Sequence, residues 1–498
     1  MKYISKYRKE IIVFIAIALL YFALRLPNLT LQPIFADEAI YIRWAQVMRA
    51  EPTLRFVSLT DGKTPLFMWT MIPLFKVIED PLLAGRLLSV LSGFVTMTGV
   101  FFLSRRVFNK NVSYWAAFIY AICPYTVFFD RMALVDSMLA GFTIWVIYFA
   151  IWLLGSLRLD IAMILGYLIG GALLVKTPAI MNVLILPLSI IGISKKMNSR
   201  LLLKLFLFWG VAILIGLVIY NMLRLGPGFQ QLSSRNADYM FSPFELVSRP
   251  LDPFIPHLRD MSDWFPKLFT IPILIAVFIG IGIAIARLNR LALIVLIWAL
   301  VPLVLEMAFL RTFTARYLLS SIPPLIVFAG FGLTKMLEKV KIKDLYKIII
   351  AVLIISPLAL KFDYQLIISP PPDNLPIEER KGYFEDWTAG YGFKEMASYI
   401  VEQSKDKRVV LGTEGFFGTL PDGIQIYLDK ENVAIVGSTA TISAQVKAAA
   451  KDYPTFFVGN KNNLKTSVNN VVLIKEYLKI KPKDSLSQDA NQLYRVLP

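Results

Sequence analysis

Two adjacent carboxylates, Asp37 and Glu38, stand just before Trp44, Ala45 and Met48, which repeat at helical spacing. This pattern predicts an amphipathic helix lying at the face of a membrane, with both carboxylates in its first turn. A carboxylate placed there could take a proton from a hydroxyl group as a general base. The alternative is that the two acidic residues merely stabilise the helix N-terminus through its dipole.

The triplet Lys-Thr-Pro occurs twice, at Lys63-Thr64-Pro65 and at Lys176-Thr177-Pro178. Threonine is a good N-cap and proline is preferred at the first helical position, so both triplets predict helix starts. A helix N-terminus beside a lysine suits a phosphate group. The alternative is that each lysine only extends its side chain to a membrane interface.

Arginines form two further groups. Arg131 lies between Asp130 and Asp136, and Arg311 and Arg316 stand close together near the other end of the apolar region. Arginine side chains suit phosphate oxygens, and charges at the ends of apolar segments usually face a cavity or each other. The alternatives are an ion pair of Arg131 with one of its neighbouring aspartates, and interfacial anchoring by the other two arginines.

The elements that must position these groups are membrane helices, because 56% of the 498 residues are apolar. The net charge of +17 belongs to residues 1–361, since residues 362–498 hold 16 basic and 17 acidic side chains. We therefore assign it to membrane orientation and not to nucleic acid binding. The single cysteine, Cys123, excludes an internal disulfide framework and a cysteine-based zinc site. Without a glycine-rich phosphate loop, and with only one histidine, His257, neither nucleotide hydrolysis nor a histidine-rich metal centre is expected.

Eleven apolar segments are expected to span the membrane. They are residues 11–26, 84–104, 112–129, 137–155, 160–175, 179–194, 205–223, 271–286, 291–310, 317–334 and 347–361. With an uncleaved first span and a cytoplasmic N-terminus, the inner loops hold 19 basic and four acidic residues, which agrees with the positive-inside rule. Two long outer loops, 27–83 and 224–270, are the expected places for a site.

Residues 362–498 change in character after the linker Pro370-Pro371-Pro372. Short apolar runs predict strands at residues 408–411, 433–436, 455–458 and 471–474, and helices are expected at 396–403 and 443–452. We expect a small α/β domain outside the cytoplasm.

The pattern Asp37-Glu38, Lys63-x-Pro65-Leu66, Arg86-Leu87-Leu88-Ser89, Arg131 to Asp136 and Arg316-Tyr317 resembles the GT-C glycosyltransferases. It is most similar to the branch that contains the protein O-mannosyltransferases and the lipid A aminoarabinose transferase. The resemblance covers about the first 360 residues. It implies a polytopic α-helical membrane protein of the GT-C fold, with a catalytic domain at 1–361 and the α/β domain at 362–498. The chain has no Trp-Trp-Asp-x-Gly motif, so transfer of an oligosaccharide to asparagine is not expected.

In such a family the resemblance implies that Asp37 is the general base and that a polyprenyl phosphate is the leaving group. The donor phosphate is expected to meet cations, which are Lys63, Arg131, Lys176 and Arg316. Asp136 is expected as a second carboxylate, and Glu38 is expected to orient Asp37. Supporting roles are expected for Tyr41, Arg86 and Arg311. No cofactor is required, and Asp37 and Asp136 would be the ligands if a divalent metal takes part.

The function expected from this resemblance is inverting transfer of a hexose or pentose from a polyprenyl-phosphate donor to a hydroxyl group. The acceptor would be a protein, a lipid or a cell-envelope glycan on the outer face of the cell membrane. The expected partners are this donor, the acceptor and membrane lipids, without nucleic acid. The alternative is a transporter or flippase of a lipid-linked substrate, in which Glu306 would be the coupling site. Transport sites usually lie at the membrane midplane, whereas these charges gather toward one face.

Overall fold

The computed structural model describes residues 2–193, 198–249, 251–405, 407–429, 431–465, 470–483 and 487–498, without the side chains of residues 2–7. The chain forms two compact units. The first unit comprises Met1–Asn28, Arg55–Phe67 and Leu87–Pro376, and the second comprises Leu29–Leu54, Met68–Arg86 and Ile377–Pro498. The division expected at residue 361 differs from this one, because residue 361 lies inside a helix and the second unit takes two segments from the first outer loop.

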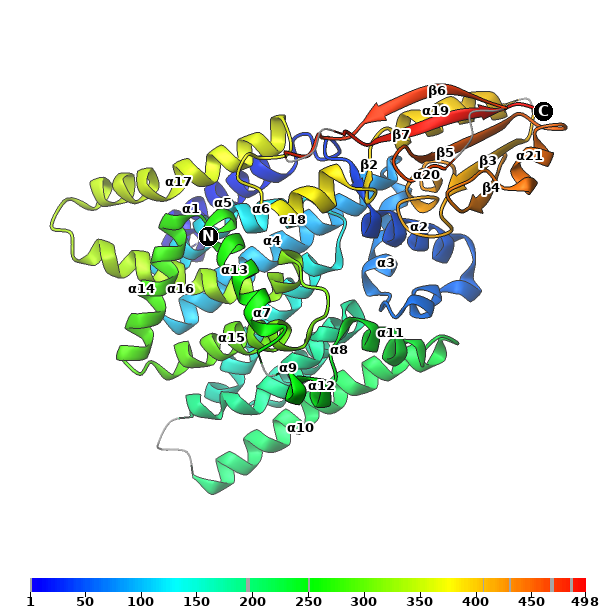
Figure 1. The fold of residues 1–498 in the computed structure, drawn as a ribbon. Helices are drawn as coiled ribbons and strands as arrows, with labels where there is room; N and C mark the ends of the chain where they lie inside the picture. Colours follow the sequence, from blue (N-terminus) through cyan, green and yellow to red (C-terminus); the bar gives the residue numbers. More distant parts are fainter. Residues whose placement is uncertain are drawn as a thin grey trace. The chain divides into compact units, whose positions relative to one another are not determined.

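The first unit is helical (Figure 1). Its long helices are α1 (Lys2–Arg25), α4 (Pro81–Val107, whose first residues belong to the second unit), α5 (Lys110–Ile122), α6 (Pro124–Asp130), α7 (Val135–Ser156), α8 (Leu159–Val175), α10 (Ser199–Asn221), α13 (Phe254–Leu268), α14 (Ile271–Ala286), α15 (Arg290–Phe309), α16 (Ile322–Glu338) and α17 (Asp344–Ile368). Shorter elements are η2 (Val57–Asp61), η4 (Thr177–Ala179), α9 (Ile180–Ile185), η5 (Leu186–Gly192), η6 (Met222–Leu225), α11 (Gln231–Tyr239), α12 (Pro243–Ser248) and η7 (Ala315–Ser321). Helix α3 (Leu66–Met71) has its first two residues in this unit and the other four in the second.

Among the described residues, six helices are long and apolar enough to cross a membrane. These are α4, α7, α10 with η6, α15, η7 with α16, and α17. The number rises to eight if each of two bent pairs is one span, α5 with α6 (57°) and α13 with α14 (113°). The first, fifth and sixth expected spans fall on α1 and on the shorter apolar helices Leu159–Val175 and Thr177–Gly192. Length and composition thus support a polytopic membrane protein with six to eight of the eleven expected spans.

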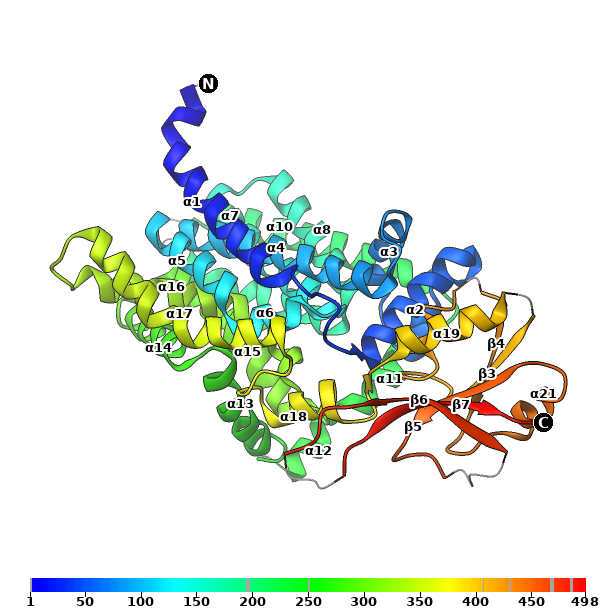
Figure 2. The same ribbon diagram turned by 90° about the horizontal axis from the view of Figure 1, so that it is seen from above.

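Small residues let some of these helices approach closely. A Cβ atom at Gly280 of α14 would lie 2.0 Å from the carbonyl oxygen of Phe328 in α16, and one at Gly332 of α16 would lie 2.0 Å from that of Ala276. Helices α14, α16 and α17 accordingly run side by side (Figure 2). Close packing of this kind is a main source of helix association inside a membrane, where burial from water contributes little.

The second unit contains a five-stranded sheet with the order β4-β3-β5-β7-β6. The strands are β3 (Val409–Glu414), β4 (Val433–Ser438), β5 (Thr455–Asn460), β6 (Val471–Leu478) and β7 (Ala490–Val496). The pairs β3/β4 and β3/β5 are parallel, while β5/β7 and β6/β7 are antiparallel. The four expected strands are confirmed, and the two expected helices correspond to α19 (Phe393–Ser404) and α21 (Ala444–Ala449).

Both faces of this sheet are covered, as alternation along β5 requires. Phe456 contacts Tyr399 of α19, with ring centroids 5.8 Å apart, whereas Phe457 belongs to a buried cluster with Val446 of α21. Neighbouring residues of a strand point to opposite faces, so α19 and α21 lie on opposite sides of the sheet. Burial on both faces explains why the inner strands β3 and β5 have no exposed residue, whereas most residues of β6 at the sheet edge are exposed.

The second unit also includes α2 (Ala36–Ala50), η1 (Pro52–Leu54), η3 (Ile72–Lys76), α18 (Ile377–Arg380), the π-turn η8 (Lys381–Glu385) and α20 (Asp422–Gln425). Strand β1 (Ile34–Phe35) pairs antiparallel with β2 (Ala389–Gly390). Ten of the fifteen residues of α2 are buried, and the ring of Trp44 lies 5.7 Å from that of Phe417. The expectation that the apolar side of α2 rests on the membrane is therefore wrong, because that side packs against the C-terminal part of the chain.

Candidate functional site

The carboxylate pair at the start of α2 has two different environments. Glu38 is fully buried and Asp37 is only half-buried. Glu38 accepts two hydrogen bonds of 2.8 Å from the guanidinium of Arg86 and one of 2.9 Å from the backbone N–H of Phe35. Such a bidentate, charge-assisted pair fixes both orientation and distance. Glu38 therefore holds the first turn of α2, and Asp37 is the carboxylate of the pair with access to a reactant.

Arg86 uses its remaining N–H groups to close the loop before α2. They donate to the carbonyl oxygens of Leu29 (2.8 Å), Gln32 (2.9 Å) and Pro33 (3.0 Å). The side chain of Arg86 has no solvent exposure. Its position supports the expected helping role, which is to shape the segment that presents Asp37. Tyr41, one turn further along α2, is also buried, and its ring lies 6.3 Å from that of Trp44.

The first unit brings together residues from three of the charged groups. Lys176, which follows the last residue of α8, donates to Asp136 in the first turn of α7 at 2.6 Å. The Lys176 ammonium lies 4.2 Å from the ring centroid of Tyr317, and the guanidinium carbon of Arg316 lies 5.2 Å from the same ring. We call Asp136, Lys176, Arg316 and Tyr317 the cationic cluster. Both cations are only half-buried, so they can meet an anion from outside.

Glu306 lies in α15, which packs against α7, the helix of Asp136, and against η7, which carries Arg316 and Tyr317. Its Oε2 atom is buried and has no hydrogen-bond partner among the described residues. The sequence offered Glu306 only as a transport residue, and its place near the cationic cluster depends on how α15 packs against α7 and η7.

Helix α11, in the second long outer loop, contacts both Lys-Thr-Pro triplets. Its Arg235 pairs with Asp61 at 2.6 Å, and its Tyr239 ring lies 5.2 Å from the Lys63 ammonium. On the same helix, Asn236 accepts a hydrogen bond of 3.2 Å from the Thr177 hydroxyl. Sequence reasoning did not single out Arg235 or Asn236. Only the length of the loop 224–270 indicated that this segment could carry functional residues.

The helices that follow the triplets are short. Helices α3 and α9 have six residues each, and η4 has three. Helices do begin at both triplets, but without the expected caps, because α3 starts at Leu66, after Pro65, and Lys176 is the N-cap of η4, with Thr177 as its first residue. Such short elements also carry only a small aligned dipole. The positive charge at these positions is therefore that of Lys63 and Lys176 themselves, which corrects the expectation of a helix N-terminal phosphate site.

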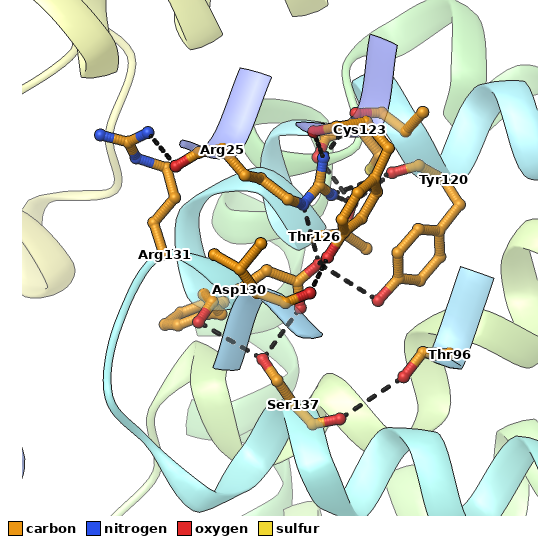
Figure 3. Close-up of polar contacts among 12 residues, drawn as sticks. Arg25, Thr96, Tyr120, Cys123, Thr126, Asp130, Arg131 and Ser137 are labelled. Carbon is orange, nitrogen blue, oxygen red and sulfur yellow. Dashed lines mark hydrogen bonds and ion pairs between the residues drawn. The ribbon is translucent and has the colours of Figure 1, made fainter. Parts of the chain in front are cut away.

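The two aspartates considered as partners of Arg131 pair with other cations, Asp136 with Lys176 and Asp130 with Arg25 at 3.0 Å. Its guanidinium donates to the carbonyl oxygens of Arg25 (2.7 Å), Pro27 (3.0 Å) and Asn28 (3.0 Å). These bonds hold the end of α1, as the contact with Arg25 in Figure 3 illustrates. The geometry therefore gives Arg131 a holding role in the first unit.

Asp130 is the centre of a fully buried network (Figure 3). Besides Arg25, it accepts hydrogen bonds from Ser137 (2.9 Å), Tyr120 (3.3 Å) and Tyr21 (3.3 Å). A buried ion pair with this many partners is costly to break, by about 3–5 kcal/mol when one partner is removed. The network joins α1, α5, α6 and α7, and its Ser137 is the residue after Asp136 of the cationic cluster.

Two further expectations concern Arg311 and metals. Arg311 pairs with Glu245 at 3.1 Å, and both side chains are largely exposed. Its backbone N–H donates to the carbonyl oxygen of Tyr239 at 2.8 Å, so it helps to hold the end of α11. Within the described ranges, no group of three or more His, Cys, Asp or Glu residues could hold a metal ion.

Comparison with known proteins supports this fold. Residues 62–223 match the family model of the dolichyl-phosphate-mannose-protein mannosyltransferases. That range includes Lys63, Arg131, Asp136 and Lys176. No curated protein sequence matches the chain significantly.

Solved structures match over most of the chain. ArnT from Cupriavidus metallidurans in the apo state has a TM-score of 0.57 at 16% identity, covering 98% of both chains. The same protein bound to undecaprenyl phosphate has a TM-score of 0.56 at 15% identity, again over 98% of both chains. AglB from Archaeoglobus fulgidus, an oligosaccharyltransferase in complex with an inhibitory peptide and a dolichol-phosphate, has a TM-score of 0.57 at 11% identity, covering 92% of this chain and 70% of that one. The chain thus has the fold of the GT-C glycosyltransferases ArnT and AglB, which confirms the resemblance found in its sequence.

Proposed function

We propose that this protein is a membrane glycosyltransferase that moves a sugar from a polyprenyl-phosphate donor to a hydroxyl group on the outer face of the membrane. The observation that carries the proposal is the whole-chain similarity to ArnT, one of whose structures holds undecaprenyl phosphate. The match of residues 62–223 to the dolichyl-phosphate-mannose-protein mannosyltransferases supports it independently, because those proteins are named for a lipid-phosphate sugar donor.

In this proposal Asp37 is the general base. Its carboxylate accepts the proton of the acceptor hydroxyl while the hydroxyl oxygen bonds to the anomeric carbon of the sugar. The bond from that carbon to the phosphate oxygen breaks, and the polyprenyl phosphate leaves with the electron pair. A single displacement inverts the configuration at the anomeric carbon. The half-buried position of Asp37 beside the fixed Glu38 supports the assignment, since a base must be both reachable and oriented.

The leaving phosphate gains negative charge, and we propose Lys63, Lys176 and Arg316 as the side chains that stabilise it. In the absence of donor, Asp136 forms an ion pair with Lys176. When the donor binds, Lys176 would leave Asp136 and pair with the donor phosphate. We retain Arg131 as a contributor to this site that acts by holding residues 25–28. Because lysine and arginine supply the positive charge, the proposed displacement needs no divalent cation. If one takes part, Asp37 or Asp136 would be its ligand.

We further propose that the N-terminus is cytoplasmic and that the acceptor is a protein, a lipid or a cell-envelope glycan outside. The excess of lysine and arginine in the expected inner loops supports this orientation. A cysteine-free background, made by replacing the buried Cys123, would allow single cysteines to be labelled from either side. Labelling of a cysteine at Lys343 from outside, and not from the cytoplasm, would contradict the assignment.

The test of function is release of sugar from a panel of polyprenyl-phosphate sugars by purified protein, with acceptor mixtures supplied. We expect release from one donor by the wild type and none by Asp37→Asn, while donor binding by the variant stays within about twofold. Asp263→Asn is the matched control, because Asp263 forms an exposed ion pair with Lys267. Equal rates for the wild type and Asp37→Asn would remove Asp37 from the mechanism.

A flippase is the second candidate, and Glu306 is the observation that favours it. An unpartnered buried carboxylate oxygen beside an ion pair is a feature of proton-coupled sites. Movement of a lipid-linked sugar across proteoliposomes that depends on Glu306 and not on Asp37, without sugar release, would establish transport in place of transfer.

A further inference from the structure

A cavity lies in the helical unit, at the ends of α4, α14 and α16 and at the starts of α5 and α15. Its volume is about 430 Å³. Its polar lining consists of Asn109, Arg287, Asn289 and Lys335, and none of the eight described residues that line it is acidic. The rings of Phe108 and Phe331 form part of its wall and stack with centroids 4.0 Å apart.

This cavity is separate from the cationic cluster. Helix α15 begins beside it, directly after Asn289, and carries Glu306 sixteen residues beyond Arg290. At 1.5 Å per residue the two positions are about 24 Å apart along the helix. The cavity and the proposed donor site therefore lie toward opposite ends of the same helix.

The two asparagines make the cavity suited to an anion. Asn109 caps α5 by accepting hydrogen bonds from the N–H groups of Asn111 and Val112, and Asn289 caps α15 by accepting one from Ala292. In both side chains the oxygen is used by the cap, so the amide NH₂ group is what each can offer to a ligand. Two helices begin here and three end here, so the partial charges of their termini offset one another, and the positive potential must come from side chains.

Arg287 and Lys335 supply full positive charges. Arg287 is exposed. The Lys335 side chain is 18% exposed and pairs with Glu338 at 2.6 Å, while Glu338 itself is half in solvent. Because Glu338 is half in solvent, this ion pair contributes little to stability, and Lys335 can exchange Glu338 for another anion. The lining therefore offers two cations and two amide donors, which matches the several oxygens of a phosphate group.

The surroundings of the cavity indicate that the phosphate belongs to a lipid. Ile285 and Leu288 flank Arg287, and Met336 follows Lys335, with exposed fractions of 48%, 72% and 41%. Apolar side chains exposed beside a basic pocket between membrane helices are typical of sites for anionic lipid headgroups. Arg287 and Lys335 also belong to loops that the charge distribution assigns to the cytoplasmic side, where anionic lipids attract basic residues.

We propose that this cavity binds the phosphate headgroup of an anionic membrane phospholipid at the cytoplasmic ends of the helices. The acyl chains would lie against the exposed apolar residues of α14 and α16, and the headgroup would accept hydrogen bonds from Arg287, Lys335 and the two asparagines. Such a lipid would hold five helix ends together. The site is independent of the glycosyl-transfer proposal, because no residue is shared.

The test is native mass spectrometry of the purified full chain after incubation with phosphatidylglycerol or with phosphatidylcholine. We expect the wild type to retain phosphatidylglycerol at least tenfold more strongly than phosphatidylcholine. The double variant Arg287→Gln/Lys335→Gln should lose this preference. The matched control is Lys339→Gln/Lys343→Gln, which removes the same charge near the same helix ends from residues that do not line the cavity, and it should keep the preference.

Three results would overturn the proposal. They are equal retention of both lipids by the wild type, equal loss of preference in both double variants, and displacement of the lipid by millimolar inorganic phosphate, which would mean a site for a free anion. If the double variant does not fold, Arg287→Gln alone changes an exposed side chain and serves instead. An increase in Tm of the wild type with phosphatidylglycerol, absent in Arg287→Gln, would then support the site, and an equal increase in both proteins would refute it.

Discussion

The contacts of Lys176 hold its ammonium group in position before an anion binds. Its charge is balanced by Asp136, whose side chain is only 4% exposed, and it rests against the face of Tyr317. The ion pair with Asp136 keeps the Lys176 ammonium in place. A phosphate can still displace Asp136 from the lysine, because a phosphate carries more acceptor oxygens and more negative charge than one carboxylate.

We predict that Lys176→Met lowers kcat by about 10²–10³, the usual loss when one stabilising donor at a developing negative charge is removed. The donor KM should also rise. Asp136→Asn should affect turnover less than Lys176→Met, because the lysine charge remains. Steady-state sugar release with each variant checks this. If Lys176→Met is fully active while Asp136→Asn is inactive, the lysine serves only to hold the aspartate.

Substitutions of the two adjacent carboxylates of α2 should have different effects, one on stability and the other on turnover. Glu38→Ala leaves the buried Arg86 without its bidentate partner, and we expect it to cost about 3–5 kcal/mol of stability. Asp37→Asn changes a half-buried group and should leave Tm unchanged while turnover is lost. Thermal unfolding measured beside activity distinguishes the two. A fall in Tm for Asp37→Asn as large as that for Glu38→Ala would make both residues structural.

From the sequence it was possible to select the residues that could take part in the reaction. It was not possible to predict which side chain each of them contacts. Asp37 stood out as one of two adjacent carboxylates at a predicted helix start, and Lys63 and Lys176 stood out because the Lys-Thr-Pro triplet occurs twice. Their partners come from distant segments, as Asp136 does for Lys176. Arg131 has two aspartates nearby in sequence but bonds to backbone carbonyls of the α1 end, which no side-chain pattern encodes.

At the scale of elements, α11 is the piece that relates the two Lys-Thr-Pro triplets. It reaches one through Arg235 and Tyr239 and the other through Asn236. Its sequence is polar, and a polar helix in a long loop has no apolar periodicity from which its contacts could be predicted. Strand β7 escaped prediction for a similar reason, because Asn491, Gln492 and Arg495 interrupt its apolar residues.

We predict that Arg235→Met lowers kcat/KM for the donor by up to about 10²-fold, because small displacements of a positioning contact can have effects of that size. Stability should hardly change, since the Arg235–Asp61 pair is partly exposed. Asp238→Asn, which alters the other partner of Arg235, is the control. The rate of sugar release measured against donor concentration gives kcat/KM for both variants. Unchanged kinetics in Arg235→Met would show that α11 does not position Lys63.

Helix α20 introduces a pH dependence into the second unit. Burial raises the pKa of Asp422 to about 6, although the Gly418 N–H and the charge of Arg43 act in the opposite direction. The folded state therefore binds the proton more tightly than the unfolded chain. This contribution to stability is fully present below about pH 4 and is lost as the pH rises through about 6.

We therefore predict that Asp422→Asn, which keeps an oxygen acceptor for the Gly418 N–H, stabilises the unit at pH 7.5 by at most about 3 kcal/mol. At pH 4 it should change stability little. Thermal unfolding of the wild type and the variant between pH 4 and pH 7.5 measures the difference. A constant offset between the two proteins across this range would mean that Asp422 does not titrate there.

At the scale of the whole molecule, the division of the chain that its composition suggests differs from its division into two compact units. The drop in hydropathy after residue 361 falls in the last turns of α17, which ends at Ile368, and composition can reveal no more than this approximate end of the membrane helices. The second unit also takes Leu29–Leu54 and Met68–Arg86, because β1 pairs with β2 more than 350 residues away. Pairing over such a distance leaves no signature in local composition, so it could not be predicted.

The stretch that carries Asp37 depends on the C-terminal residues in several ways. The backbone N–H of Ala36 donates to the carbonyl oxygen of Thr388 at 3.1 Å, and Gln46 donates to that of Ile426 at 2.8 Å. Arg43 and Arg49 both pair with Asp429, at 3.2 and 2.6 Å. These contacts, together with the β1–β2 pairing, determine the position of α2 within its unit.

We accordingly predict that a chain ending at Pro376 loses all sugar release, although none of the residues proposed to act on the donor or acceptor is removed. Residues 29–54 should become sensitive to proteases in this variant, because α2 loses the partners that bury it. The control is Asp429→Asn in the full chain, which removes two partly exposed ion pairs and should lower Tm only slightly. If the shortened protein is inserted in the membrane and releases sugar at the wild-type rate, then α2 holds Asp37 in place without the C-terminal residues, and the contacts between them serve another purpose.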